Sequence, residues 1–96
     1  MVARVVVYTT RYCGYCHAAK RLLNAKGVSF EEIACDTRPD LRTWLRQASG
    51  QRTVPQIFIN NDSIGGYSEL AALESRGSLD PRLAEAPDPA LPGLPM

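Results

Sequence analysis

The sequence has little of what disulfide scaffolds, haem sites and membrane spans require. It contains three cysteines, one histidine and one tryptophan among 96 residues, and its two methionines stand at the two ends. Three cysteines are too few and too uneven in number for a secreted scaffold held by disulfides. No apolar run approaches the roughly 20 residues of a membrane-spanning helix. We therefore expect no membrane anchor and cysteines that work as free thiols.

A strong charge of one sign is also absent. Eleven Lys and Arg stand against ten Asp and Glu, for a net charge of +1, which argues against a basic nucleic-acid binder. The charges are distributed unevenly: residues 1–55 hold nine basic and four acidic side chains, whereas residues 56–96 hold two and six. The basic part favours an anionic partner, such as a small molecule that carries carboxylates.

The length and the 45% hydrophobic content suit one compact domain with a modest core. The first residues show no charged leader, no long apolar stretch and no small-residue cleavage site of the kind found in signal peptides. We therefore expect a cytoplasmic protein, because thiols remain reduced in that compartment.

The hydrophobic pattern predicts an α/β protein. The expected elements are a strand over 2–9, a helix over 16–26, a strand over 29–34, a helix over 39–49, a strand over 56–59, a strand over 63–64, and a helix capped by Ser68 that stops at Gly77, followed by a turn at Asp80-Pro81. The order β-α-β-α-β-β-α predicts a four-stranded mixed sheet flanked by helices, since a βαβ unit gives parallel strands and a hairpin gives antiparallel ones.

The C-terminal end differs in composition from the rest. Residues 86–96 hold four of the seven prolines and show no periodicity. Such a segment has few hydrogen-bond donors and cannot bury a core. We expect a domain over residues 1–85 and a Pro-rich, disordered tail over residues 86–96.

The motif with the strongest chemical signal is Cys13-Gly14-Tyr15-Cys16, between the first strand and the first helix. The N-terminus of a helix presents unpaired backbone N–H groups and a partial positive charge, which favour a thiolate. The thiolate is the nucleophilic form of cysteine. We therefore predict Cys13 as the attacking thiol and Cys16, one turn further in, as a shielded resolving thiol.

Two other readings of these cysteines remain open. The run from Cys13 to His17 also spells the C-x-x-C-H pattern of haem attachment, but the chain has no internal methionine for an axial ligand. Cys13, Cys16, His17 and Cys35 supply the four ligands of a zinc site, yet adjacent Cys16 and His17 make tetrahedral closure awkward. We expect no metal, and we expect Cys35 to be a small buried hydrophobe.

Cys13-Gly14-Tyr15-Cys16, Thr53-Val54-Pro55 and Gly65-Gly66, in this order and spacing, resemble the motifs of a glutaredoxin of the small bacterial dithiol type. The resemblance extends from about Val5 to Leu83. It implies a thioredoxin-like fold and an enzyme that reduces protein disulfides and mixed disulfides with glutathione. Glutathione is then a co-substrate rather than a permanently bound cofactor, and the other partners are glutathionylated or disulfide-containing proteins. It also implies a monomer.

The same resemblance implies a glutathione site. The Val54-Pro55 bond is expected to be cis and to face the cysteines, with the backbone of Val54 pairing with glutathione and Arg42 holding the glycyl carboxylate. Thr10 stands where a Lys is common, and Arg11 or Arg38 is expected to compensate. The residues implied in glutathione binding are Arg11, Tyr15, Arg42, Thr53, Val54, Pro55, Gly66, Tyr67 and Ser68.

Two variants of this function remain open. Relatives with a residue smaller than proline at the position of Gly14 bridge a [2Fe–2S] cluster between two subunits, so Cys13 is an alternative cluster ligand in a dimer that forms only with the cluster. A relative that uses mycothiol with the same C-G-Y-C motif is the other alternative, although Gly65-Gly66 and Arg42 favour glutathione.

Overall fold

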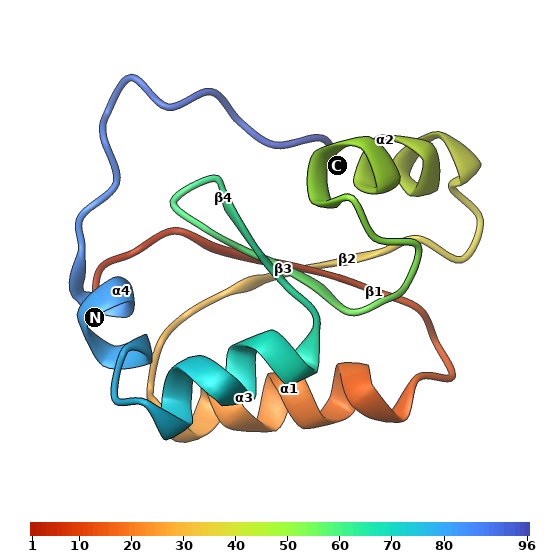
Figure 1. Ribbon diagram of the computed structural model, residues 1–96. Helices are drawn as coiled ribbons and strands as arrows, with labels where there is room; N and C mark the ends of the chain where they lie inside the picture. Colours follow the sequence, from red (N-terminus) through yellow and green to blue (C-terminus); the bar gives the residue numbers. More distant parts are fainter.

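A four-stranded mixed sheet forms the middle layer of the protein (Figure 1). The computed structural model describes all 96 residues. Its elements are β1 (Val5–Thr9), α1 (Gly14–Ala25), β2 (Glu31–Ala34), α2 (Pro39–Ser49), β3 (Gln56–Ile59), β4 (Asp62–Gly65), α3 (Tyr67–Ser75) and α4 (Leu79–Ala84).

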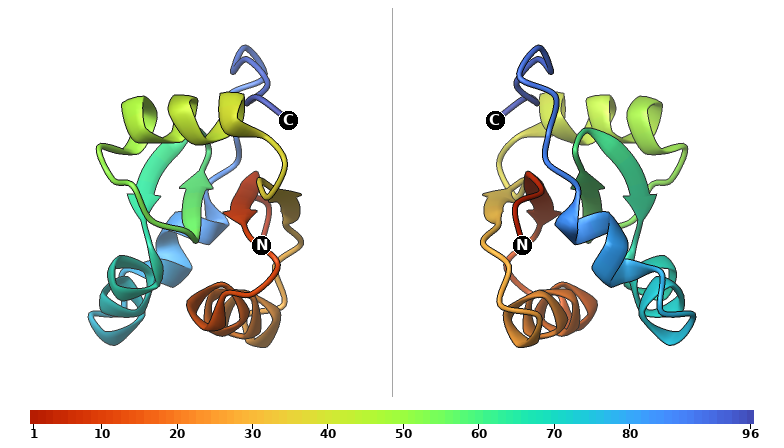
Figure 2. Two further views of the ribbon diagram at one scale, coloured as in Figure 1. Left: turned by 90° about the vertical axis from the view of Figure 1, so that its right-hand side faces the viewer. Right: turned by 90° about the vertical axis from the view of Figure 1, so that its left-hand side faces the viewer.

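The strands lie in the order β2-β1-β3-β4, with β1 parallel to β2 and antiparallel to β3, and with β4 antiparallel to β3. Helices α1 and α3 cover one face of the sheet, and α2 covers the other (Figure 1, Figure 2). This is the thioredoxin-like arrangement, and it confirms the predicted fold class. None of the helices is both long and apolar enough to span a bilayer.

Strand β1 is a central element of the packing, and all five of its residues are buried. Successive side chains of a strand point to opposite faces. Val5 and Val7 accordingly join the core beneath α1 and α3, and Val6 and Tyr8 join the core beneath α2. The strand therefore connects both hydrophobic layers and carries the chain to the turn that precedes Cys13.

The bounds of several elements differ from those expected, and among them β2 begins at Glu31 rather than Ser29 and β4 spans Asp62–Gly65 rather than 63–64. Strand β1 begins at Val5 rather than Val2, because the N–H groups of Val2 and Ala3 both donate to the carbonyl of Leu83 and hold this segment against α4 instead. Helix α1 begins at Gly14, two residues earlier than predicted. A short helix, α4, replaces the expected turn at Asp80-Pro81.

Helix α3 begins at a different cap from the one expected. Its N-cap is Gly66 rather than Ser68, because the Oε1 atom of Glu69 accepts a hydrogen bond from the Gly66 N–H at 2.7 Å. A carboxylate three residues into a helix commonly bonds back to the N-cap in this way. The helix therefore starts two residues earlier and brings its N-terminus close to the loop before β3.

The segment from residue 86 to residue 96 has no helix or strand, and it crosses to the side of α2 (Figure 1). Leu94 packs against the apolar cluster of that side, and the Tyr8 hydroxyl donates to the carbonyl of Pro95 at 2.6 Å. Burial raises the pKa of Tyr8 to about 12, so this hydroxyl remains a donor at neutral pH. The domain boundary at residue 85 and the disorder of the tail stay predictions.

Truncation after Glu85 should lower the melting temperature of the protein. It removes the Tyr8–Pro95 hydrogen bond and the contact of Leu94, and a loss of about 1 kcal/mol shifts Tm by about 4–8 °C in a domain of this size. Thermal unfolding followed by circular dichroism measures the shift. Tyr8→Phe is the matched single-site variant, since it removes only the hydrogen bond. An unchanged Tm in the truncated protein would instead support a tail that is disordered.

Candidate active site

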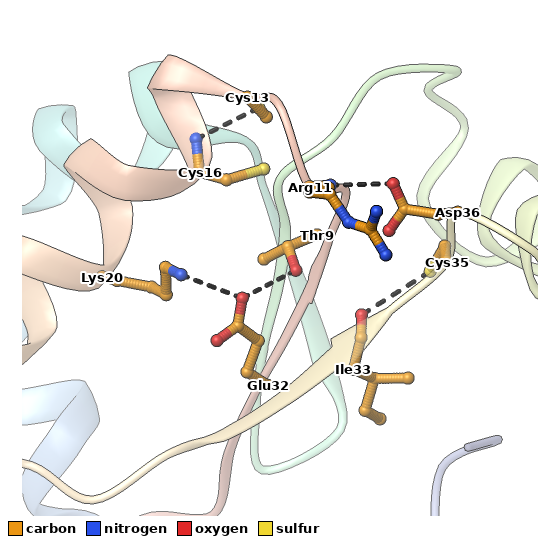
Figure 3. A network of polar contacts seen from close by, with 9 residues as sticks. All are labelled: Thr9, Arg11, Cys13, Cys16, Lys20, Glu32, Ile33, Cys35 and Asp36. Atoms are coloured by element: carbon orange, nitrogen blue, oxygen red, sulfur yellow. Dashed lines mark hydrogen bonds and ion pairs between the residues drawn. The ribbon is translucent and has the colours of Figure 1, made fainter.

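The turn after β1 places Cys13 at the N-cap of α1. Its backbone is extended, with φ −135° and ψ 107°, and its Sγ accepts a hydrogen bond from the Cys16 N–H at 3.2 Å (Figure 3). An N-cap side chain ordinarily uses an oxygen atom to accept a hydrogen bond from the backbone N–H of the second or third helical residue. Here the sulfur is the acceptor, so the thiol that was predicted to be the nucleophile lies at the helix N-terminus and contacts one of its backbone N–H groups.

Cys16 has a different environment from Cys13. Its side chain is 1% exposed, whereas Cys13 is only partly buried. Burial, with the hydrogen bond to Cys13 as a second cause, raises the pKa of Cys16 to about 12. The structure thus gives the chain one accessible thiol and one shielded, protonated thiol, which agrees with the separation of roles expected from the sequence.

The loop before β3 faces Cys13. The Val54-Pro55 peptide bond is cis, as the resemblance implied, and the Val54 carbonyl lies 3.6 Å from the Cys13 Sγ. The N–H of Val54 has no hydrogen-bond partner within the protein. A free backbone donor beside the reactive sulfur is suited to pairing with an extended, peptide-like ligand.

Gln56 holds this loop, and the sequence reasoning did not single it out. Its side chain is completely buried, and its Nε2 donates to the Thr53 carbonyl and to Gln51 Oε1, both at 2.9 Å. The signal was available as one polar residue at the start of the apolar strand Gln56–Ile59. Buried polar side chains are usually hydrogen-bonded to a segment that they position.

The paired glycines let α3 approach the same loop. Gly65 has φ +109°, and a Cβ atom there would lie 2.5 Å from Glu69 Oε1. A Cβ at Gly66 would lie 3.3 Å from the Pro55 carbonyl oxygen. The positive φ favours glycine at position 65, and the small size of Gly66 allows the N-terminus of α3 to approach the Thr53–Pro55 loop closely.

A groove of about 340 Å³ runs between the loop and the start of α3. Tyr15 and Tyr67 flank it, with ring centroids 6.2 Å apart and planes inclined by 27°. It brings together seven of the residues that the resemblance implied in glutathione binding, and Gln51 and Glu69 also line it. The seven are Tyr15, Thr53, Val54, Pro55, Gly66, Tyr67 and Ser68.

The arginines expected at this groove lie elsewhere. Arg42 lines a neighbouring hollow, where its Nη2 donates to the Arg52 carbonyl at 3.1 Å. Arg11 lines a third, smaller hollow, because Asp36 accepts its backbone N–H at 2.8 Å and fixes the turn on the β2 side (Figure 3). Arg38 pairs with Asp40 at 2.8 Å. The roles of Arg11 and Arg42 in binding stay predictions.

A polar network fastens α1 to the sheet below the cysteines. Glu32 on β2 accepts hydrogen bonds from Lys20 Nζ at 2.9 Å and from the Thr9 hydroxyl at 2.8 Å (Figure 3). The hydrogen bond from Lys20 is the main cause that lowers the pKa of Glu32. The network fixes α1, the helix at the cysteine pair, against β1 and β2, and β1 leads into the turn before Cys13.

The four side chains considered for zinc are not gathered into a site. The structure contains no group of three or more His, Cys, Asp or Glu side chains arranged to hold a metal ion. Cys35 is 2% exposed and packs in the core under α2, which confirms the expectation that it is a small buried residue. Burial also raises the pKa of its thiol.

An accessible thiol at a helix N-terminus, with a shielded thiol one turn away, is suited to the exchange of disulfides. The thioredoxin-like sheet presents this pair beside a cis-proline loop. The fold and the site together define a thiol–disulfide oxidoreductase.

Comparisons with known proteins specify the family. A sequence model of the glutaredoxin family matches residues 5–64. A glutaredoxin of Pseudomonas aeruginosa is 52% identical over 80 residues, covering 83% of this chain and 95% of its own length, and glutaredoxin 3 of Escherichia coli K12 is 50% identical over 82 residues, covering 85% and 99%. The chain belongs to the glutaredoxin family.

Solved structures agree with this assignment. The solution structure of a glutaredoxin from Brucella melitensis has a TM-score of 0.77 and 46% identity, covering 86% of this chain and 89% of its own. A buckwheat glutaredoxin in complex with glutathione has a TM-score of 0.79 and 36% identity, covering 84% and 76%.

Iodoacetamide should label Cys13 in the native protein and leave Cys16 unlabelled. In Cys13→Ser, Cys16 should still resist labelling up to about pH 10, because burial is the main cause of its raised pKa and the thiolate is the reactive form. Peptide mass spectrometry after a timed reaction measures both sites, and the denatured protein is the control for full reactivity. Rapid labelling of Cys16 at pH 7 would contradict the shielded position.

Proposed function

We propose that the protein uses glutathione to reduce glutathione mixed disulfides and protein disulfides through the Cys13 thiolate. The observation that carries the proposal is the groove beside Cys13, which holds a free backbone donor, two tyrosine rings and a helix N-terminus. The buckwheat protein of similar fold is described in complex with glutathione. The location and the oligomeric state of this chain stay predictions.

The reaction is two successive thiol–disulfide exchanges. The Cys13 thiolate attacks the glutathionyl sulfur of the mixed disulfide, a new S–S bond forms, and the client protein leaves as a thiolate. A second glutathione thiolate then attacks the glutathionyl sulfur on Cys13, which releases oxidised glutathione and returns Cys13 to the thiolate. The net reaction consumes one free glutathione, which leaves as oxidised glutathione together with the glutathionyl group that the client carried.

Cys16 offers the second route. Its sulfur attacks the Cys13 Sγ, releases glutathione, and leaves a Cys13–Cys16 disulfide that glutathione later reduces. Burial raises the pKa of Cys16 and keeps its thiol protonated at neutral pH. We therefore propose the exchange with a second glutathione as the main route for mixed disulfides and the internal disulfide as the route for clients that carry no glutathione.

The groove suits an extended tripeptide. Val54 offers its N–H to the glutathione backbone, and the start of α3 at Gly66 offers the N–H groups of Tyr67 and Ser68 to the γ-glutamyl carboxylate. Among the backbone N–H groups at the start of α3, the Glu69 carboxylate accepts a hydrogen bond from Gly66 only. Arg42, in the adjoining hollow, is the proposed partner of the glycyl carboxylate.

Cys13→Ser should abolish the reduction of a glutathione mixed disulfide, and Cys16→Ser should retain it. The first variant removes the nucleophile, whereas the second leaves intact the hydrogen bond from the backbone of residue 16. A coupled assay with glutathione reductase and NADPH measures the rates. Substantial activity in Cys13→Ser would overturn the mechanism. Loss of activity in Cys16→Ser would show that the reaction proceeds through the internal disulfide instead of through a second glutathione.

Arg42→Ala should raise the KM for a glutathione mixed disulfide about fivefold to tenfold with a smaller change in kcat, because it removes one charge-assisted contact to a carboxylate. Arg21→Ala is the matched control, since Arg21 is an exposed arginine on α1 outside all of the hollows described above. Steady-state kinetics at fixed ionic strength measure both constants. An unchanged KM would show that Arg42 is not the carboxylate partner.

Cluster binding is the second candidate function. A Cβ atom at Gly14 would have no neighbour within 4 Å, so the space beside Gly14, next to Cys13 in the chain, is open. This openness leaves Cys13 accessible as a ligand for a [2Fe–2S] cluster shared with a second subunit. The same openness also serves a bulky disulfide substrate, so cluster binding stays a prediction.

A further inference from the structure

A second and larger hollow lies beside the glutathione groove. Its volume is about 570 Å³, and the two hollows share no lining residue. Helix α2 contributes Arg42, Thr43 and Arg46, and the following loop contributes Arg52. Three guanidinium groups therefore face one hollow of a protein whose overall net charge is only +1.

These arginines have no acidic partner. Arg42, Arg46 and Arg52 form no ion pair, although other basic residues of the chain pair with carboxylates at 2.6–3.4 Å. Asp36 is the one carboxylate at the hollow, and one of its oxygens already accepts the Arg11 backbone N–H. Three guanidinium groups against one carboxylate leave an excess of positive charge at the hollow, so an anion that binds among the arginines relieves their mutual repulsion.

Two segments of the chain connect the hollow to the site of the reacting sulfur. Thr10 lines it and lies three residues before Cys13, and Arg52 lines it and lies two residues before Val54, whose carbonyl is 3.6 Å from the Cys13 Sγ. Two short stretches of chain therefore connect the residues of the hollow to the cysteine site.

Glutathione does not account for the whole hollow. Its two carboxylates are satisfied by the start of α3 and by Arg42 in the function proposed above. Arg46 and Arg52 remain, and both are exposed to solvent. Planar guanidinium groups are the side chains that best pair with carboxylates. The protein portion of a glutathionylated client is the part of the substrate that neither the groove nor Arg42 accounts for.

We propose that Arg46 and Arg52 form a docking site for an Asp- and Glu-bearing segment of the client protein, next to its glutathionylated cysteine. The site selects clients by charge, while the glutathione groove recognises the group that all of them carry. This inference rests on the proposed reduction of glutathione mixed disulfides.

Two glutathionylated peptides test the proposal, identical except that one carries Glu and the other Gln on both sides of the cysteine. The wild-type protein should reduce the Glu peptide with a kcat/KM about fivefold higher at low salt, because two exposed ion pairs form. The ratio should fall towards one at high salt. The double variant Arg46→Gln, Arg52→Gln should lose the preference and retain its rate on the Gln peptide.

The control is Arg21→Gln, Arg76→Gln, which removes the same net charge from two exposed arginines outside the hollow. It should retain the preference for the Glu peptide. No preference in the wild type, or an equal preference in the Arg46 and Arg52 double variant, would overturn the docking site. Wild-type inactivity on both peptides would contradict the proposed function instead. Inhibition by a short single-stranded oligonucleotide, without any preference between peptides, would assign the arginines to nucleic acid and also overturn it.

Discussion

The site depends on the hydrogen bond from the Cys16 backbone N–H to the Cys13 sulfur. It fixes the rotamer of Cys13, satisfies one of the unpaired amides of α1, and brings the helix N-terminus to bear on the thiol. The orientation of the sulfur in turn determines which loop it faces, and that loop is the cis-proline segment at Val54. The groove between this loop and the start of α3 thus lies beside one fixed sulfur position.

The rest of the fold holds the two sides of that contact in place. Strand β1 is buried on both faces and ends at the turn before Cys13, while β3 lies beside it and begins directly after Pro55. Adjacent antiparallel strands thus bring together two segments more than 40 residues apart in the sequence. Gln56 completes the arrangement from inside, since its buried amide binds the Thr53 carbonyl. Rigid strands on both sides keep the loop and the thiol in register.

Much of this arrangement was predictable because it depends on local signals. Apolar runs and turn residues predicted the sheet, and the resemblance of the cysteine, proline and glycine motifs to those of glutaredoxins implied the residues of the groove. The predictions were wrong where a contact between side chain and backbone, which the hydrophobic pattern does not encode, determines the local structure. Ser68 is a good cap by residue type, but the side chain of Glu69 moves the cap to Gly66. Arg11 lies away from the groove because Asp36, 25 residues further on, holds its backbone. Neither effect is visible in sequence periodicity.

The donor to the Cys13 sulfur is the main-chain amide of residue 16. The contact to the first thiol and the presence of the second thiol are therefore separate properties of the C-x-x-C motif. Any residue other than proline at position 16 supplies the same N–H to the same sulfur, because the backbone of α1 does not depend on the side chain there. The hydrogen bond to the first thiol is therefore a property of the helix backbone, and the second thiol is an independent addition. A lineage of such proteins can lose its second cysteine in a single substitution and keep a working nucleophile.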